Sequence, residues 1–246
     1  MSLIETRFRS LVAAQEGKSP LARKSTMFDG YIGRATCEFP QGTESTPFDL
    51  FQTTFTVPPA PHKNEGQTIF IFPGVQPARS SKHIAVLQPV LQWGKSATGG
   101  SESWTAQTYY IRGTRETGLD VGAYSSRQNV NIGDELNATI RLEEARDVSG
   151  IRTYFYSSKL EGIDGTYLGI DAPEPFVQVG LAIEIYAGSS CSSLPNGNEI
   201  AMQSIVKSEG ATLSPNWQIV AEAMCSFNVT AAESNGIQEI LFEYKL

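Results

Sequence analysis

Two carboxamides share one face of a strand-like run near the middle of the chain. Residues 85–93 (AVLQPVLQW) alternate, so that one face is apolar and the other carries Gln88 and Gln92. A carboxamide can both donate and accept hydrogen bonds. The pattern predicts a sheet that is packed on one face and hollowed for function on the other.

A single carboxyl group lies on the matching face of the longest run, residues 176–186 (FVQVGLAIEIY). Glu184 is the only charged side chain of this run and shares its face with Gln178 and Tyr186. A carboxylate beside apolar walls has a raised pKa, because desolvation disfavours its charged form, and such a group suits acid–base catalysis. The alternative is a solvent-facing strand on which Glu184 is an ordinary surface charge.

Aromatic side chains dominate the run 104–112, where Trp104 and Tyr110 share a face. Rings beside amides and hydroxyls are typical of a groove for a sugar or a peptide, because the rings stack and the polar groups set orientation. Trp and Tyr are also good strand formers, so simple packing is the alternative interpretation.

The standard catalytic sets are missing from the sequence. It has no G-x-S-x-G elbow and no glycine-rich phosphate loop that opens a helix. His62 and His83 lie in proline-rich or basic loop contexts and complete no metal-ligand spacing. We therefore expect neither a metal nor a cofactor.

The overall charge disfavours some partners. The chain has 246 residues, a formal net charge of −7 and a pI of about 5.0, so we expect no binding to nucleic acid or to an anionic membrane. No run approaches the roughly 20 apolar residues of a membrane span. The start of the chain shows no signal peptide, which makes the cytoplasm the default compartment and leaderless secretion the alternative. The sequence leaves the oligomeric state open.

The three cysteines, Cys37, Cys191 and Cys225, are too far apart for a zinc ribbon. Three buried thiols are the favoured interpretation. A bridge between Cys191 and Cys225 is the main alternative.

From Phe28 onward the chain is a series of short β-like runs separated by Pro and Gly, without helical patterns between them. This organisation is typical of an antiparallel sandwich or barrel. We expect a leader over residues 1–26, helical or disordered, and a single β-sandwich domain over residues 27–246. The expected strands are 48–57, 67–72, 84–93, 104–112, 119–124, 129–132, 135–142, 151–157, 165–170, 176–186, 217–220 and 237–245, with 199–206 less certain.

The order of these motifs resembles the glutamic peptidases known as eqolisins. The series is FPGVQ at 72–76, AVLQ at 85–88, an aromatic strand at 104–110, VNIGD at 130–134 and a strand ending in Ile-Glu at 183–184. The resemblance implies an antiparallel two-sheet β-sandwich, a concanavalin A-like jelly roll. It also implies a catalytic dyad of one glutamine and one glutamate, which the motifs match to Gln88 and Glu184.

The sequence departs from the family at two acidic positions. The family's Trp-Val-Gly-Ile-Asp-Gly segment is Phe-Pro-Gly-Val-Gln-Pro at residues 72–77, without the Trp or the acid. The family's Tyr-Glu-Trp-Tyr strand is Gln-Thr-Tyr-Tyr at residues 107–110, without the glutamate. The resemblance therefore supports the fold more strongly than the activity.

Two hypotheses for function follow. In the first, the chain is a glutamic-peptidase-like hydrolase, in which Glu184 activates a water and the Gln88 amide donates to the oxyanion. In the second, it is a non-catalytic, lectin-like carbohydrate-binding protein that uses the same groove. The ligand in the concave groove is accordingly a peptide or a glycan. The residues expected to bind it are Gln92, Trp104, Tyr110, Gln178 and Tyr186.

Overall fold

A computed structural model describes residues 27–39, 47–114 and 118–246. The leader expected over residues 1–26 lies outside these ranges. Most of the described residues are in strands, and the helices among them are two single-turn 3₁₀ helices, η1 (Cys191–Ser193) and η2 (Met224–Ser226). Among the described residues, no helix has the length and hydrophobicity needed to cross a membrane.

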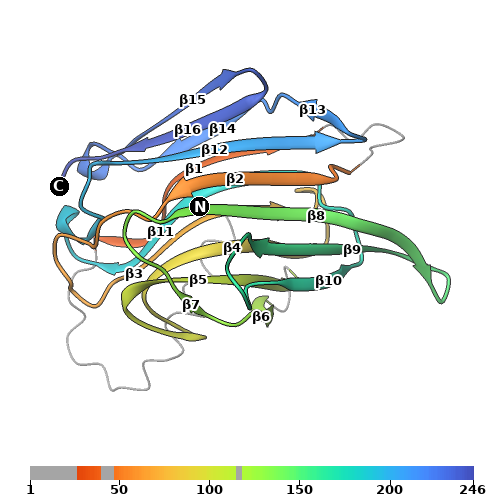
Figure 1. Ribbon diagram of the computed structural model, residues 1–246, viewed down its shortest axis with the longest axis horizontal. Helices are drawn as coiled ribbons and strands as arrows, with labels where there is room; N and C mark the ends of the chain where they lie inside the picture. Colours follow the sequence, from red (N-terminus) through yellow and green to blue (C-terminus); the bar gives the residue numbers. More distant parts are fainter. Residues whose placement is uncertain (1–26, 40–46, 115–117) are drawn as a thin grey trace.

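Two antiparallel sheets lie one behind the other (Figure 1), which confirms the predicted two-sheet β-sandwich. Sheet A consists of β14 (Gln218–Ala221), β1 (Phe28–Glu38), β11 (Gln178–Gly188), β3 (Thr68–Gln76), β4 (His83–Ser96), β5 (Gly99–Thr114) and β6 (Gly118–Tyr124) in this order, with β7 (Gln128–Asn129) also on β5. Sheet B consists of β10 (Leu168–Ala172), β9 (Ile151–Leu160), β8 (Glu135–Val148), β2 (Leu50–Thr56), β12 (Glu199–Ser208), β16 (Ile237–Glu243) and β15 (Asn228–Ser234) in this order, with β13 (Ala211–Leu213) also on β12.

The main core fills the space between the two sheets. Leu87 and Leu91 of β4 belong to it together with Phe51 of β2, as the alternation in 85–93 predicts. Each side chain of this size contributes about 2 kcal/mol by leaving water. Val90 belongs instead to a second apolar cluster on the opposite face of sheet A. The predicted division of this strand into two faces is therefore correct.

Strand β3 does not end at Pro73, where the sequence predicted a stop, but continues to Gln76. The ladder between β3 and β4 is interrupted instead: it pairs up to Ile71 and resumes at Val75 in the same register. That register sets Pro73 opposite Pro89. Neither proline has an N–H to donate, so the two strands run side by side through a short stretch without ladder pairs.

The sequence prediction missed strands β1, β13 and β15, and β1 is the one that bears on the site. Its glycines, Gly30 and Gly33, and its polar side chains hide the apolar alternation. A register shift between Tyr31 and Gly33 breaks the period further. The consequence matters for function, because β1 pairs with β11 and places Tyr31 directly across from Glu184.

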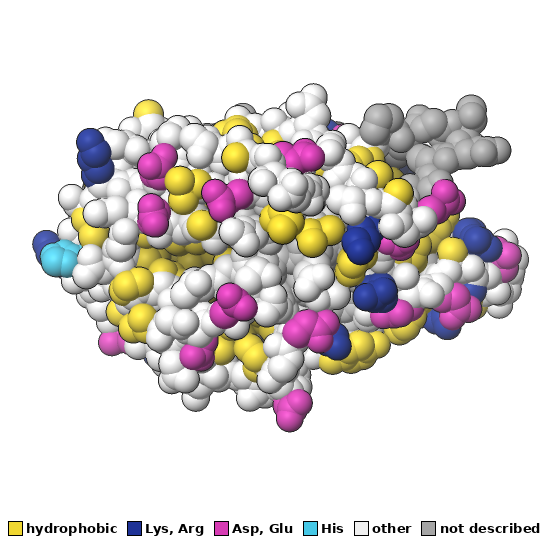
Figure 2. All heavy atoms as spheres, turned by 45° about the horizontal axis from the view of Figure 1, so that its top comes forward, with side chains coloured by type: hydrophobic (Ala, Val, Ile, Leu, Met, Phe, Trp, Pro, Cys, Tyr) yellow, Lys and Arg dark blue, Asp and Glu magenta, His cyan; other side chains and the backbone are white. Residues whose placement is uncertain are grey.

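A disulfide joins Cys191 in η1 to Cys225 in η2, while Cys37 is a free, buried thiol. The favoured expectation of three buried thiols is therefore wrong for two of them. The bridge ties the connection after β11 to the connection before β15. Figure 2 shows hydrophobic, acidic and basic side chains interspersed over the face that it presents.

Candidate functional site on the outer face of sheet A

The face of sheet A that is turned away from the main core, here called the outer face, carries its own buried cluster. Its members are Phe70, Phe72, Val90, Tyr109, Ile111, Ala182 and Tyr186. Because side chains alternate along a strand, Gln88, Gln92, Gln178 and Glu184 lie on this same face. The structure thus places the predicted amides and the predicted carboxyl group on one surface of one sheet.

Glu184 is buried on this face, with 1% of its surface exposed. Its strand neighbours are Tyr31 on β1 and Phe70 on β3. The Tyr186 hydroxyl donates to Glu184 Oε2 at 3.1 Å, and Glu184 Oε1 is buried without a partner among the described residues. The alternative that Glu184 is an ordinary surface charge is therefore wrong.

Burial has a chemical consequence for this carboxyl group. Desolvation raises the pKa of Glu184 to about 7. Hydrogen bonds from Tyr31 and Tyr186 and the nearby charge of Arg34 lower this pKa, but their effect is smaller than that of desolvation. Near neutral pH the group is thus divided between its protonated and ionised forms. That is the condition under which one residue can both take and return a proton.

Gln88 is farther from Glu184 than the predicted dyad requires. The β3–β4 register sets Gln88 opposite Gly74, and Gly74 pairs with Gly180 on β11. Glu184 is four residues beyond Gly180, about 13 Å along the strand, and two strand spacings add about 10 Å across the sheet. The two Cα atoms are therefore about 16 Å apart. A single water between the side chains does not fit this separation, and that part of the prediction needs correction.

Gln92 is the amide that lies level with Glu184, since both face Phe70 from its two sides. Its hydrogen-bonding capacity is already used. The Gln92 side-chain amide donates to the carbonyls of Gly94 and Gly99, and its carbonyl accepts from the Tyr109 hydroxyl at 2.7 Å. It is fully buried. The structure thus gives Gln92 the role of fixing the β4–β5 hairpin.

Trp104 and Tyr110 lie on the wrong face of β5 for the predicted groove. Both belong to the core between the sheets, where Trp104 packs edge-on against Trp93 with ring centroids 5.5 Å apart. The outer face receives Gln107 and Tyr109 instead. The period of the strand was predicted correctly but its orientation was not. The pairing of Trp93 with Trp104 across the hairpin is the signal that could have settled it.

A cavity of about 470 Å³ opens on the outer face, and Glu184 is not among the residues that line it. Tyr31, the cross-strand neighbour of Glu184, lines it together with Arg34, Thr36 and Gln178. Gln178 donates its amide to the Pro77 carbonyl. Tyr31 and Arg34 are functional candidates that sequence reasoning missed, because strand β1 was not recognised. Across the described ranges, no three His, Cys, Asp or Glu side chains gather in a way that could hold a metal ion.

The fold is that of the glutamic peptidases. A crystal structure of scytalido-glutamic peptidase with a peptide-based transition-state analogue matches at a TM-score of 0.52 and 14% identity, covering 89% of this chain and 100% of that one. SCP-B, a member of the eqolisin family of peptidases in complex with the tripeptide Ala-Ile-His, matches at 0.51 and 12% over the same shares. No family model and no curated protein matches the sequence. At these identities the likeness establishes the fold alone.

Proposed function

We propose that this chain is a peptide hydrolase that works on the outer face of sheet A, with Glu184 as its acid–base residue. The observation that carries the proposal is a buried carboxyl group with a pKa near 7 and one unpartnered oxygen, whose cross-strand neighbour Tyr31 lines a cavity. Buried titratable groups with strongly perturbed pKa values are concentrated at functional sites. The glutamic-peptidase fold supports the same reading.

In the proposed reaction, ionised Glu184 takes a proton from a water, and the resulting hydroxide adds to the carbonyl carbon of the scissile peptide bond. The oxyanion that forms is stabilised by a phenol O–H, and Tyr31, which lines the cavity, serves as the donor when its hydroxyl turns from Glu184 to the oxyanion. Protonated Glu184 then gives its proton to the leaving amine, and the C–N bond breaks. Glu184 ends ionised, as it began.

In this proposal Gln88 is not the oxyanion donor. The distance of about 16 Å between Gln88 and Glu184 corresponds to about five residues of an extended chain. Gly74 and Gly180 lie level with Gln88 and leave the sheet open beside it, while Phe72 and Ala182 form the floor between Gln88 and Glu184. We assign Gln88 to binding the substrate main chain at a distance from the scissile bond. We assign Gln178 to binding the substrate at the end of this face where the cavity lies.

A peptide fits this face better than a glycan does. The predicted glycan platform depended on stacking by Trp104, Tyr110 and Tyr186; the first two rings are in the core between the sheets, and only Tyr186 is on the outer face. Binding of a peptide without cleavage is the remaining alternative. The near-complete burial of Glu184 is the observation that favours it.

The test is cleavage of a quenched fluorescent peptide library from pH 4 to 9, with the cut bonds identified by mass spectrometry. We expect Glu184→Gln to lower kcat by at least 100-fold, the usual scale of general acid–base catalysis. Gln88→Ala should raise KM about fivefold with little change in kcat, since it removes one hydrogen bond to bound substrate. Glu102→Gln, an exposed glutamate of β5, is the matched control.

Equal cleavage by wild type and Glu184→Gln would refute the catalytic role. If no library member is cut, peptide binding measured by calorimetry decides between the two readings of this face. Binding that weakens in Gln88→Ala supports the non-catalytic alternative. Absence of both cleavage and binding removes the peptide hypothesis altogether.

A further inference from the structure

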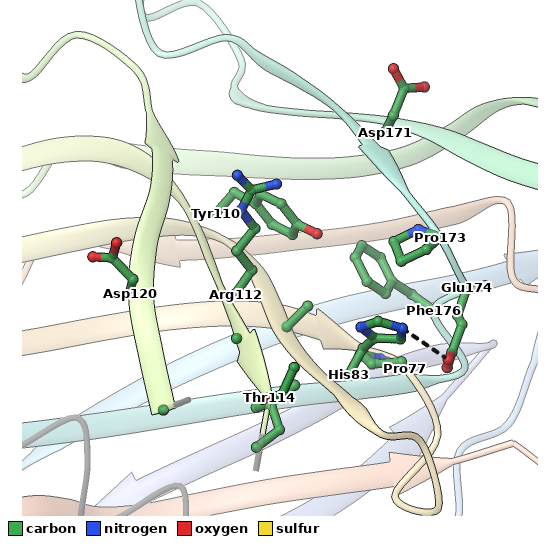
Figure 3. Close-up of a pocket in the computed structure, with 14 residues that line it drawn as sticks. Pro77, His83, Tyr110, Arg112, Thr114, Asp120, Asp171, Pro173, Glu174 and Phe176 are labelled. Carbon is green, nitrogen blue, oxygen red and sulfur yellow. Dashed lines mark ion pairs between the residues drawn. The ribbon is translucent and has the colours of Figure 1, made fainter. Parts of the chain in front are cut away.

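A second cavity, of about 560 Å³, lies at one end of the sandwich, on the core side of sheet A. Tyr110 of β5, Phe176 just before β11, and Pro173 enclose it (Figure 3). The residues that it shares with the cavity on the outer face are Pro77, His83, Ile84 and Ala85, so the β3–β4 hairpin forms a wall of both. Its volume falls within the range of small-molecule sites.

Tyr110 directs its hydroxyl into this cavity (Figure 3). The residue is only 5% exposed, and within the described part of the chain its hydroxyl has no hydrogen-bond partner. In Figure 3 the hydroxyl points towards the space beside Phe176 and Pro173. Burial raises the pKa of Tyr110, so the phenol stays protonated and able to donate. Because the hydroxyl faces the cavity, it can donate a hydrogen bond to a molecule bound there.

Arg112 adds a positive charge next to this hydroxyl. Its guanidinium lies beside the Tyr110 ring (Figure 3). The side chain passes over Gly122 of β6, where an added Cβ would come within 2.9 Å of Arg112 Nε. No carboxylate among the described residues pairs with Arg112.

The acidic residues around the cavity are directed elsewhere. Asp171 accepts a hydrogen bond from Arg146 at 2.8 Å, and Glu174 lies 3.9 Å from the His83 imidazole. In Figure 3 the carboxylates of Asp120 and Asp171 point away from the cavity. The cavity wall is therefore mixed: Phe176, Pro77 and Pro173 are apolar, His83 and Glu174 are paired with each other, and Tyr110 and Arg112 lie at one side.

We propose that this cavity binds a small apolar molecule that carries a carboxylate. The apolar body packs against Phe176, Pro77 and Pro173, and the carboxylate accepts from the Tyr110 hydroxyl and pairs with Arg112. A hydroxyl beside a guanidinium is a charge-assisted donor pair suited to a carboxylate. This site is separate from the proposed peptide-cleaving face, and its occupancy does not depend on Glu184.

The test is a two-dimensional amide NMR titration with phenylbutyrate and octanoate, using phenylbutanamide as the uncharged control. We expect saturable shifts at backbone amides around Tyr110 and Phe176. Tyr110→Phe, which keeps the ring, should weaken binding about fivefold, and Arg112→Gln about tenfold. Tyr124→Phe and Arg152→Gln alter exposed residues away from the cavity and should leave the affinity unchanged. Glu184→Gln should bind like wild type.

Ala85→Leu is a second route to the same answer, because Ala85 lines the cavity and a larger side chain reduces its volume. With the fold intact by amide NMR, it should abolish the shifts. The proposal is overturned if neither carboxylate gives saturable shifts at the cavity. It is also overturned if phenylbutanamide binds as tightly as phenylbutyrate, or if Tyr110→Phe and Arg112→Gln bind like wild type.

Discussion

Replacing Glu184 by Gln should make the protein more stable at pH 8 than the wild type, by about 3 kcal/mol. The pKa of Glu184 lies at about 7 and that of a solvated glutamate at 4.5. The difference, about 2.5, corresponds to about 3 kcal/mol at about 1.4 kcal/mol for each pKa unit. This is the cost of keeping an ionised carboxylate buried beside Phe70 and Tyr186, and the neutral amide does not incur it.

The pH dependence gives the sign of the effect. The folded state holds the Glu184 proton more tightly than the unfolded state does, so the unfolded state binds fewer protons between pH 4.5 and 7. Wild-type stability from this group is fully present below pH 4.5, falls as the pH rises towards 7, and is constant above that value. The gap between Glu184→Gln and wild type should therefore grow by about 3 kcal/mol across this interval.

The measurement is urea unfolding at pH 4.5, 6, 7 and 8, with Glu102→Gln as the exposed control on the same sheet. Comparison of Glu184→Gln with this control removes the contribution of all other titrating groups to the pH dependence, because each variant has lost one glutamate. The reasoning is refuted if the gap between Glu184→Gln and wild type is the same at every pH. Such a result means that the carboxyl group is solvated in the folded protein, and the acid–base argument is lost with it.

Two further predictions concern parts of the structure that hold the site in place. Gln92→Ala should lower the free energy of unfolding by about 3 kcal/mol, because it leaves several buried partners unsatisfied; urea unfolding measures this, and a loss below about 1 kcal/mol contradicts it. Cys191→Ser with Cys225→Ser should cost about 4 kcal/mol, from the entropy of closing a loop of 34 residues. Thiol labelling followed by intact mass measurement checks the bridge independently. Two reactive cysteines besides Cys37 in the unfolded, unreduced protein would show that the bridge does not form.

Much of the fold was predictable because alternation in single strands is a local property. The two faces of 85–93 and of 178–186 follow from the period of a strand alone, and the structure agrees with both, while Phe176 precedes β11 and packs in the main core instead of on the predicted polar face. The disulfide was not predictable in the same way, because pairing of Cys191 with Cys225 depends on how two distant connections meet. The prediction of strand β1 failed for the opposite reason, because its glycines and its register shift disturb the local alternation itself.

Which face of a strand joins the core is a separate question from the period with which its side chains alternate. In 104–112 two assignments are possible, and the sequence of that run favours neither, because both faces carry an aromatic residue and a polar one. The choice is made across the hairpin, where Trp104 meets Trp93 and so must join the core face. Tyr110 follows Trp104 into the core for the same reason, and the cavity there is the result.

The relation between Gln88 and Glu184 shows the same limit at the scale of the whole sheet. Each residue can be assigned to a face from its own strand, but the distance between them depends on how β3 aligns with both β4 and β11. A shift of four residues in either register would bring the two side chains level without changing any face. Motif matching cannot detect such a shift, because it compares each strand separately. The observed register makes Gln92 the amide level with Glu184, yet its hydrogen bonds commit it to the hairpin. Within the described residues, the polar side chains that reach Glu184 are the phenols of Tyr31 and Tyr186, and the proposed reaction therefore depends on these two residues.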